Sequence, residues 1–288
     1  MQVWDRATKA IIETPTVGEG AMRFCYETAV GRFLTKAILC RKPVSALYGA
    51  VQKSFFTKHK ARKFMRQYGI TAADCEKQEF SSFNDFFTRK RLPQPDTTQP
   101  NELPAVADCK LTALPIGRDS VFTVKGVRYT LPELLENDAL AERFCGGWCL
   151  IFRLSPDDYH RYSYPDAGTQ ERTVHIPGVL HSVNPIAGSM GVYRRNSRCY
   201  TLLHTAQFGD VLEMEVGALL VGKILNHEEA AGTRFEKLQE KGYFAYGGST
   251  VILLLEPGRV ALDEDILRYS AQGIESRVRT GERIGEAL

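Results

Sequence analysis

A run of five apolar residues, Val251–Leu255, directly follows the segment Gly247-Gly248-Ser249-Thr250. An uninterrupted apolar run of this length, closed here by Glu256-Pro257-Gly258, is typical of a β-strand. An aromatic strand, Tyr243–Tyr246, ends where the two glycines begin. In most proteins two glycines between such strands form a hairpin turn, and Ser-Thr adds ordinary turn polarity. Glycines also allow a strained backbone, in which a peptide bond can be attacked by the serine that follows it.

Short apolar runs separated by Gly and Pro turns continue through most of the chain beyond Ala105. Their spacing predicts a β-rich sandwich or barrel-like domain with few helices. One helix is expected over Leu131–Arg143, where Pro132 suits the first turn. The expected strands are Phe122–Lys125, Trp148–Arg153, Arg172–Ile176, Thr201–Thr205, Val211–Val221 and Thr250–Leu255.

The front of the chain has a different pattern. Apolar residues recur at the helical period over residues 20–68, in two segments that Pro43 divides. Four prolines over residues 93–104 then mark a linker or a strap across the surface. The sequence therefore predicts an α+β protein, with a mainly helical region over residues 1–95 and a β-rich domain over residues 96–288.

Charge is distributed unevenly between these two parts. Residues 1–95 hold 17 Lys and Arg against 8 Asp and Glu, whereas residues 96–288 hold 20 against 26. A basic amphipathic helix beside aromatic side chains is attracted to an anionic lipid surface, where each cation contributes ~1 kcal/mol. The alternatives are a solvated helix face packed on its own domain and, less favoured, nucleic acid, for which no groove-reading motif is present. The basic and apolar residues concerned are Phe55, Phe56, Lys58, Lys60, Arg62, Lys63, Phe64 and Met65.

Hydropathy and the N-terminus constrain where the protein acts. No run approaches the ~20 apolar residues needed to cross a bilayer, and the first residues, Met-Gln-Val-Trp-Asp-Arg, lack the form of a secretory signal. Together with the basic front, this predicts a peripheral membrane protein on the cytoplasmic face of the cell membrane.

Cysteine and histidine spacing gives no indication of a metal site. Seven cysteines are scattered without a Cys-x-x-Cys pair, and six histidines show no His-Glu-x-x-His pattern. An odd number of scattered cysteines favours reduced, mostly buried thiols over a disulfide framework. We therefore expect no structural metal.

Several separated segments resemble, in the same order, those of the phosphatidylserine decarboxylase proenzymes. The resemblance spans most of the chain, so the Gly-Gly-Ser-Thr element does not stand alone. The segments are Ser82–Pro93, Val106–Asp108, Phe152–Arg161, His175–Pro185, Val216–Ile224, Gly247–Thr250 and Gly281–Gly285.

This resemblance implies an autoprocessed, pyruvoyl-dependent decarboxylase in which residues 96–288 form the catalytic domain. In the family the chain is cut before the serine, here between Gly248 and Ser249, into a large piece 1–248 and a small piece 249–288. The serine becomes a covalent pyruvoyl group, which forms a Schiff base with the substrate. Phosphatidylserine is then converted to phosphatidylethanolamine and carbon dioxide. The resemblance also implies a heterodimer of the two pieces, with further homo-oligomerisation left open.

The resemblance assigns roles to individual residues. A serine hydroxyl is a poor nucleophile, so Ser249 needs a base, which an Asp/His pair supplies in the family. Asp108 matches the family's catalytic aspartate, and His160 matches its motif histidine, our candidate proton donor in decarboxylation. The family motif reads His-Arg-x-His, whereas this chain has Ser163 at the second histidine. The base for self-cleavage is therefore either His160 or another histidine, for which His181 is the second choice.

Two other functions stay open at this point. The missing second histidine is compatible with a non-processing relative that only binds lipid. A serine hydrolase that keeps Ser249 as its nucleophile is a further alternative, although a Gly-x-Ser-x-Gly motif is absent. Free amino acids are alternative substrates, against which the basic front argues. A smaller departure from the family is Cys109, which follows Asp108 where glycine is common.

Overall fold

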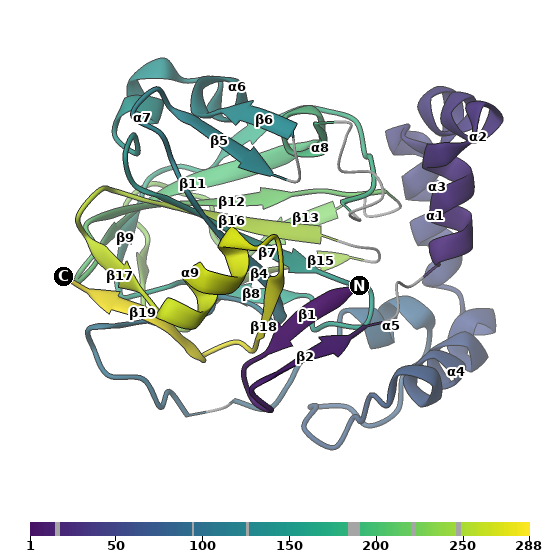
Figure 1. Cartoon of the computed structure of the whole chain (residues 1–288). Helices are drawn as coiled ribbons and strands as arrows, with labels where there is room; N and C mark the ends of the chain where they lie inside the picture. Colours follow the sequence, from purple (N-terminus) through teal and green to yellow (C-terminus); the bar gives the residue numbers. More distant parts are fainter. Residues whose placement is uncertain (15–17, 94, 125–126, 184–190, 220–222, 246–248) are drawn as a thin grey trace.

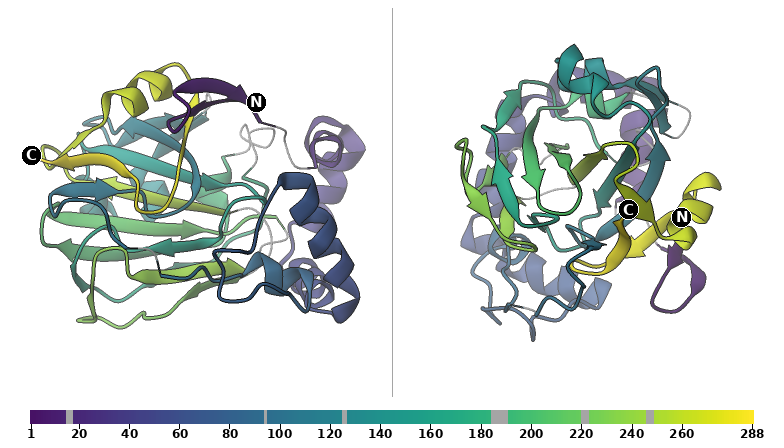
Figure 2. Two further views of the ribbon diagram at one scale, coloured as in Figure 1. Left: turned by 90° about the horizontal axis from the view of Figure 1, so that it is seen from below. Right: turned by 90° about the vertical axis from the view of Figure 1, so that its left-hand side faces the viewer.

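The structure is a computed structural model that describes the whole chain apart from residues 15–17, 94, 125–126, 184–190, 220–222 and 246–248. It confirms the α+β fold class. A β-rich body contains most of the chain beyond residue 96, and helices from the front stand at one side of this body (Figures 1 and 2).

One large mixed sheet forms the centre of the body. Eleven of the described strands belong to it, in the order β14-β9-β11-β12-β16-β7-β4-β18-β1-β2, with β10 beside β11. The pair β1 and β18 is parallel, and the other pairs are antiparallel. The described strands thus follow an open order, which corrects the expected barrel-like closure. The strands are β1 (Gln2–Asp5), β2 (Ala10–Glu13), β4 (Cys109–Pro115), β7 (Trp148–Leu154), β9 (Gly168–Gln170), β10 (Val174–Ile176), β11 (Arg198–Thr205), β12 (Asp210–Val216), β14 (Arg234–Phe235), β16 (Ser249–Leu255) and β18 (Glu275–Val278).

Three smaller sheets accompany the large one. Their strand orders are β13-β15-β8, β17-β19-β3 and β5-β6. The strands are β3 (Glu102–Pro104), β5 (Val121–Val124), β6 (Val127–Thr130), β8 (Arg161–Ser163), β13 (Lys223–Asn226), β15 (Glu240–Ala245), β17 (Val260–Leu262) and β19 (Arg283–Ala287).

The uninterrupted apolar run lies in the middle of the large sheet. Strand β16 pairs with β12 on one side and with β7 on the other. Every residue of Val251–Leu255 is fully buried, so side chains on both faces of this strand contribute to the core. A strand covered on both faces has no polar side to alternate with, which explains why the run contains only apolar residues.

The helical front is confirmed as a set of short helices. They are α1 (Glu19–Glu27), α2 (Ala29–Leu34), the π-helical turn η1 (Thr35–Leu39), α3 (Lys42–Gln52), the 3-10 turn η2 (Phe55–Thr57), α4 (Lys58–Tyr68) and α5 (Phe83–Phe87). Many large apolar side chains of this region are exposed. They are Phe24, Val30, Phe33, Leu34, Ile38, Leu47, Val51, Phe55 and Phe56.

Part of the expected exposed face of α4 is instead packed inside the protein. Phe64 and Met65 pack against a small buried cluster that includes Phe83 and Phe86. The Phe64 ring lies edge-on to the Phe83 ring, with centroids 5.5 Å apart. Lys60 also lies over the Phe83 ring, at 4.9 Å from its centroid. The interpretation of α4 as a helix packed on its own domain therefore holds for this face, while Phe55 and Phe56 stay exposed.

Two further features differ from the sequence-based expectation. The first residues of the front form β1 and β2, and β1 joins the large sheet by pairing with β18. The helix expected over Leu131–Arg143 is divided into α6 (Leu131–Leu135) and α7 (Asp138–Glu142). Glu136 adopts a left-handed conformation that ends α6, and the Asn137 side chain accepts the Leu140 N–H to begin α7. Two more helices are α8 (Val192–Arg195) and α9 (Glu264–Ala271).

Every described helix is too short or too polar to span a bilayer. All seven cysteines are free thiols, five of them buried, as the scattered spacing predicted.

Candidate active site

Strand register places the start of β16 at the side of the large sheet where β7 ends and β4 begins. This side, formed by the ends of strands, is called the edge of the sheet. The backbone of Ser249 pairs with Leu154 at the end of β7, and Thr250 pairs with Arg153. Arg153 in turn pairs with Lys110, near the start of β4. Neighbouring strands are ~4.8 Å apart, so the start of β4 lies about 10 Å from Ser249 across the sheet. Asp108 immediately precedes β4 and therefore lies at the same edge.

Asp108 is largely buried and held by both carboxylate oxygens. Its Oδ1 accepts hydrogen bonds from the Thr280 N–H at 2.9 Å and from the Thr280 hydroxyl at 3.0 Å. Its Oδ2 lies 2.8 Å from Nη1 of Arg91. These contacts fix the orientation of the carboxylate and keep a positive charge beside it. The pKa of Arg91 is raised, because attraction to Asp108 outweighs the loss of hydration on burial.

His160 lies at the end of the loop that follows Leu154, so this loop starts beside Ser249. The His160 side chain is buried, and its Nδ1 lies 3.0 Å from the Asp158 carbonyl oxygen. A carbonyl oxygen only accepts, so Nδ1 carries the hydrogen, and in the neutral ring Nε2 is the acceptor. The Phe87 ring packs on the imidazole with centroids 4.0 Å apart. The His160 carbonyl accepts the Phe244 N–H at 2.9 Å, which ties this loop to β15.

A strap after α5 connects these two candidate residues. Phe87 contacts His160 from one end of the strap, and Arg91 pairs with Asp108 at the other end. Tyr159, the residue before His160, contacts Arg91 in two ways. The Arg91 guanidinium lies over the Tyr159 ring, 4.3 Å from its centroid, and the Tyr159 hydroxyl accepts the Arg91 backbone N–H at 3.0 Å. The strap thus brings the aspartate and histidine segments together without a described contact between their side chains.

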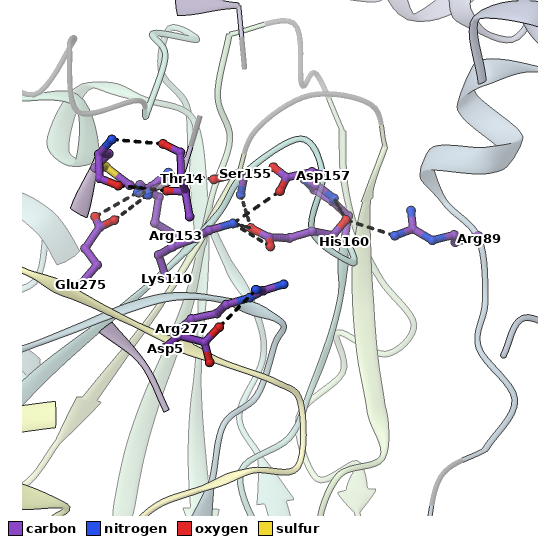
Figure 3. A network of polar contacts seen from close by, with 12 residues as sticks. Asp5, Thr14, Arg89, Lys110, Arg153, Ser155, Asp157, His160, Glu275 and Arg277 are labelled. Atoms are coloured by element: carbon purple, nitrogen blue, oxygen red, sulfur yellow. Dashed lines mark hydrogen bonds and ion pairs between the residues drawn. The ribbon is translucent and has the colours of Figure 1, made fainter. Parts of the chain in front are cut away.

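Behind the loop lies a network of buried charges (Figure 3). The Lys110 ammonium lies 2.8 and 2.7 Å from the two carboxylate oxygens of Asp158. Arg153 makes a bidentate pair with Glu275, at 3.0 and 2.5 Å. Burial raises the pKa of Asp158, although Lys110 opposes this shift. For Arg153, burial would lower the pKa, but attraction to Glu275 raises it overall.

His181 lies at the same edge of the sheet, on the other side of β16. The Asn196 amide donates to the carbonyl oxygens of His181 at 2.8 Å and Gly217 at 2.7 Å. Gly217 follows Val216, the residue of β12 that pairs with Thr250. The structure therefore places His181 near the start of β16, but separates it from His160 by that strand.

The helical front contacts the His181 segment directly. Cys40 Sγ lies 3.1 Å from Nδ1 of His181, and the Cys40 carbonyl accepts the Leu180 N–H at 3.2 Å. The Tyr26 hydroxyl accepts the Ser182 N–H at 2.7 Å. Burial raises the pKa of the Cys40 thiol to about 11, so the thiol is neutral at pH 7. Burial, followed by the charge of Arg195, lowers the pKa of His181, which is therefore neutral at pH 7.

The two departures from the family motifs are both buried. Ser163 ends β8, and its N–H donates to the Val106 carbonyl at 2.9 Å, two residues before Asp108. Cys109 is fully buried, and burial raises the pKa of its thiol, so it adds no charge beside Asp108. Position 163 thus lies close to the aspartate, where a second histidine would be expected to act.

The predicted cleavage site is only partly within the described residues. Gly247 and Gly248 lie outside them, and for Ser249 the backbone pairing is described. Among the described residues, no group of three or more His, Cys, Asp and Glu side chains is arranged to hold a metal ion.

The sequence indicated Asp108 and His160 as candidates but not the residues that contact them. Arg91 carried a weak indication, because it lies in a segment that resembles the family. Thr280 and Glu275 gave none, because they are brought to the site by strands far away in the sequence.

Comparison with known families shows the class of protein to which this arrangement belongs. The family model for phosphatidylserine decarboxylase matches residues 83–286, which is most of the chain. The chain belongs to the phosphatidylserine decarboxylase family, and is an enzyme of that decarboxylase class.

Full-length relatives agree with the family match. A phosphatidylserine decarboxylase proenzyme 2 of Clostridium acetobutylicum is 40% identical over 287 residues, which cover 99% of this chain and 98% of the relative. A phosphatidylserine decarboxylase proenzyme of Clostridium botulinum is 40% identical over 298 residues, covering 100% and 99%. A phosphatidylserine decarboxylase proenzyme of Clostridium novyi is 37% identical and covers all of both chains. The similarity therefore includes residues 1–82 of the helical front, which lie before the residues that the family model matches.

Proposed function

We propose that this chain is a self-cleaving proenzyme that converts phosphatidylserine to phosphatidylethanolamine and carbon dioxide. Cleavage before Ser249 turns that serine into the pyruvoyl cofactor. The observation that carries the proposal is the position of Ser249 at the start of the central strand β16, at the sheet edge shared by Asp108 and the His160 loop. The relatives named as proenzymes support the cleavage step.

The backbone at the start of β16 fits a covalent group at residue 249. The strand pairs with β7 from Ser249 to Leu255 and with β12 from Thr250 to Leu255, so a new N-terminus at Ser249 stays anchored after the preceding bond is cut. Nothing in this anchoring depends on the peptide bond to residue 248. The terminal group is thereby kept beside the His160 loop.

Self-cleavage transfers a proton from the Ser249 hydroxyl as its oxygen adds to the carbonyl carbon of residue 248. The receiving base is neutral before the transfer, and His160 and His181 both border β16. His181 is held neutral at pH 7 by burial. Asp108 keeps a negative charge at this edge, which stabilises a histidine that becomes protonated. The C–N bond between residues 248 and 249 then breaks, the nitrogen of residue 249 takes up the proton, and an ester is left. The ester breaks by elimination, residue 248 leaves as a carboxylate, and hydrolysis of the resulting dehydroalanine releases ammonia.

For the decarboxylation, the pyruvoyl group supplies a carbonyl that accepts the electrons released when carbon dioxide leaves an amine-bearing substrate. The protein must then deliver one proton to the carbon that lost the carboxylate. His160 is the proposed donor, because its ring is fixed by Asp158 and Phe87 on the loop that starts beside Ser249. These contacts exclude water from one face of the imidazole.

We also propose that the helical front attaches the enzyme to the cytoplasmic face of the membrane. Phe33, Phe55 and Phe56 are 71%, 71% and 83% exposed, which is unusual for phenylalanine on the surface of a soluble protein. Basic residues of α4 lie next to two of them in the sequence. Aromatic insertion combined with attraction to anionic headgroups would bring the substrate to the edge of the sheet that the front contacts.

The decisive activity test uses phosphatidylserine vesicles labelled in the serine carboxyl group. The wild-type chain is expected to release labelled carbon dioxide, and Ser249→Ala is expected to release none. Release by Ser249→Ala at the wild-type rate would refute the role of this serine.

Two alternatives are separated by independent measurements. A non-processing lipid-binding relative would bind the vesicles, remain a single chain, and gain cleavage from Ser163→His. A serine hydrolase would be labelled at Ser249 by a fluorophosphonate probe, which a converted serine cannot be. The proposal predicts cleavage of the unmodified chain and no labelling.

A further inference from the structure

We propose that Lys110 and Asp158 are positioning residues that hold His160 for proton transfer, and that Glu275 supports them from the small piece 249–288. This inference rests on the proposed role of His160 in the decarboxylation. It concerns the buried charged network behind the loop, whose side chains have no part in the chemistry described above (Figure 3).

Asp158 closes the loop that leads to His160. Its Oδ2 accepts the Ser155 N–H at 2.7 Å, and its own N–H donates to the Ser155 carbonyl at 2.9 Å. Side chain and backbone thus lock the loop into one tight turn. In this turn the Asp158 carbonyl points at Nδ1 of His160, at 3.0 Å. The position of the imidazole is therefore a direct consequence of how Asp158 is held.

Lys110 holds Asp158. Its ammonium is within 2.8 Å of both carboxylate oxygens, and the Lys110 side chain is only 5% exposed. Asp157 lies farther away, with 3.8 Å between its Oδ2 and the same ammonium. If the ammonium were removed, the buried carboxylate would lose the partner that compensates its lost hydration. The turn would then relax, or Asp158 would take up a proton and release Ser155.

The network continues into the small piece. Arg153 Nη1 donates to the Ser155 hydroxyl at 2.9 Å, which fixes the first residue of the turn. The other nitrogens of Arg153 pair with Glu275, and both side chains are at most 7% exposed. Glu275 begins β18, which lies beyond the cleavage point in the sequence. Both cleavage products thus contribute charges that define the His160 loop.

The geometry gives a specific expectation for kinetics. A positioning role lowers the rate of the chemical step at each assembled site and leaves substrate binding nearly unchanged. A role in stability alone lowers the amount of processed enzyme but not the activity of each site. The quantity to measure is therefore kcat divided by the number of pyruvoyl groups, together with KM for phosphatidylserine in mixed micelles.

The test compares Lys110→Met and Asp158→Asn with the control Arg277→Met. Arg277 lies directly opposite Lys110 in the register of β4 and β18 and pairs with Asp5 at 3.4 Å, and none of its described side-chain contacts is with the His160 loop. Lys110→Met and Asp158→Asn are each expected to lose about tenfold or more in kcat per pyruvoyl group, with KM within about twofold of wild type. The control is expected to keep both constants, and Glu275→Gln to show a smaller loss of kcat.

Unchanged kcat per pyruvoyl group in Lys110→Met and Asp158→Asn would overturn the proposal. A folded but uncleaved Lys110→Met chain has no pyruvoyl group by which to normalise kcat, and Asp158→Asn then decides alone. If Lys110→Met does not accumulate in folded form, Asp158→Asn decides alone, since its amide oxygen can still accept the Ser155 N–H. Wild-type protein without a pyruvoyl group would instead refute the proposed function, which is a separate result.

Discussion

Asp108 and Arg91 form a charged pair at the edge of the sheet where β16 starts, so replacing the carboxylate tests its role directly. In Asp108→Asn, Arg91 keeps only Asp74 of its two carboxylate partners, and a histidine that gains a proton at this edge is no longer stabilised by Asp108. We expect self-cleavage to slow by about 10²-fold or more, measured as the decay of the intact chain on a denaturing gel.

Asp74 provides a matched control for this prediction. It also pairs with Arg91, at 3.1 Å, but is more exposed and precedes α5 in the sequence. Asp74→Asn should cleave at the wild-type rate. Equal slowing in both variants would mean that Arg91, and not the catalytic carboxylate, is responsible.

His160 is the residue for which the account predicts the largest loss in the decarboxylation itself. His160→Asn removes the proton donor, so kcat per pyruvoyl group should fall by about 10²- to 10⁴-fold, measured as labelled carbon dioxide. His175→Asn is the control, because His175 is exposed and pairs only with the surface residue Glu229 among its described contacts. Normal turnover in His160→Asn would mean that another group donates the proton.

The sequence was sufficient to select Asp108 and His160 as candidates because each lies in a short motif whose residues are contiguous. It was not sufficient to find Thr280, which bonds to Asp108 from 172 residues away. That contact depends on β18 pairing beside β4, and pairing between distant strands leaves no local pattern. For the same reason the sequence could not place His181 on the opposite side of β16 from His160.

At the scale of elements, the helical front is predicted to bind lipid through its exposed aromatics. Replacing Phe33, Phe55 and Phe56 together by Ser removes three large apolar side chains from the surface that is proposed to bind the membrane. We expect co-sedimentation with anionic vesicles to weaken roughly tenfold or more, because each buried phenylalanine contributes ~1.5–3 kcal/mol. The circular dichroism of the variant should be unchanged.

Val174→Ser serves as the control for this experiment. Val174 is an exposed apolar residue of β10, on the body and not on the front. Its replacement should leave vesicle binding intact. Unchanged binding in the triple variant, or binding that is equally weak in both, would exclude the front as the anchor.

The elements themselves were predictable to different degrees. The period of apolar residues identified the helical front and the buried strand β16, because both patterns are local. The helix over residues 131–143 was wrong in continuity, since Glu136 and Asn137 end one helix and begin another through cap geometry. Strand β1 was missed because four residues carry little periodicity, and its stability comes from pairing with β18.

At the scale of the whole molecule, a buried charge cluster inside the body should make stability depend on pH. Glu213, Glu215 and Lys241 are all fully buried, and Lys241 pairs with Glu215. The carboxylate oxygens of Glu213 have no hydrogen-bond partner among the described residues, and one of them lies 3.9 Å from Lys241. Burial raises the pKa of Glu213 to about 8. The Lys241 ammonium thus lies beside two carboxyl groups, and Glu213 is the one that keeps its proton at neutral pH.

The sign of the effect follows from proton binding. Between the ordinary glutamate pKa of 4.5 and about 8, the folded chain keeps a proton on Glu213 that the unfolded chain has lost. Stability therefore falls as pH rises through this range. Thermal unfolding should show a smaller loss of Tm from pH 5 to pH 9 in Glu213→Gln than in wild type. Glu236→Gln, which removes the same charge from an exposed position, should retain the wild-type slope, and equal slopes in all three proteins would contradict the prediction.

The two cleavage products are interleaved in the fold. From the small piece 249–288, β16 lies between β7 and β12, and β18 lies between β4 and β1. The pieces are therefore expected to stay associated as a heterodimer after cleavage, and native chromatography would not reveal that the chain has been cut.

Intact-mass spectrometry under denaturing conditions is the measurement that tests self-cleavage and cofactor formation together. The account predicts two species, residues 1–248 and residues 249–288, with the small one lighter than the unmodified peptide by one ammonia. It also predicts that Ser249→Ala stays intact. A single species of 32.3 kDa in a preparation that actively releases carbon dioxide from phosphatidylserine would contradict the account.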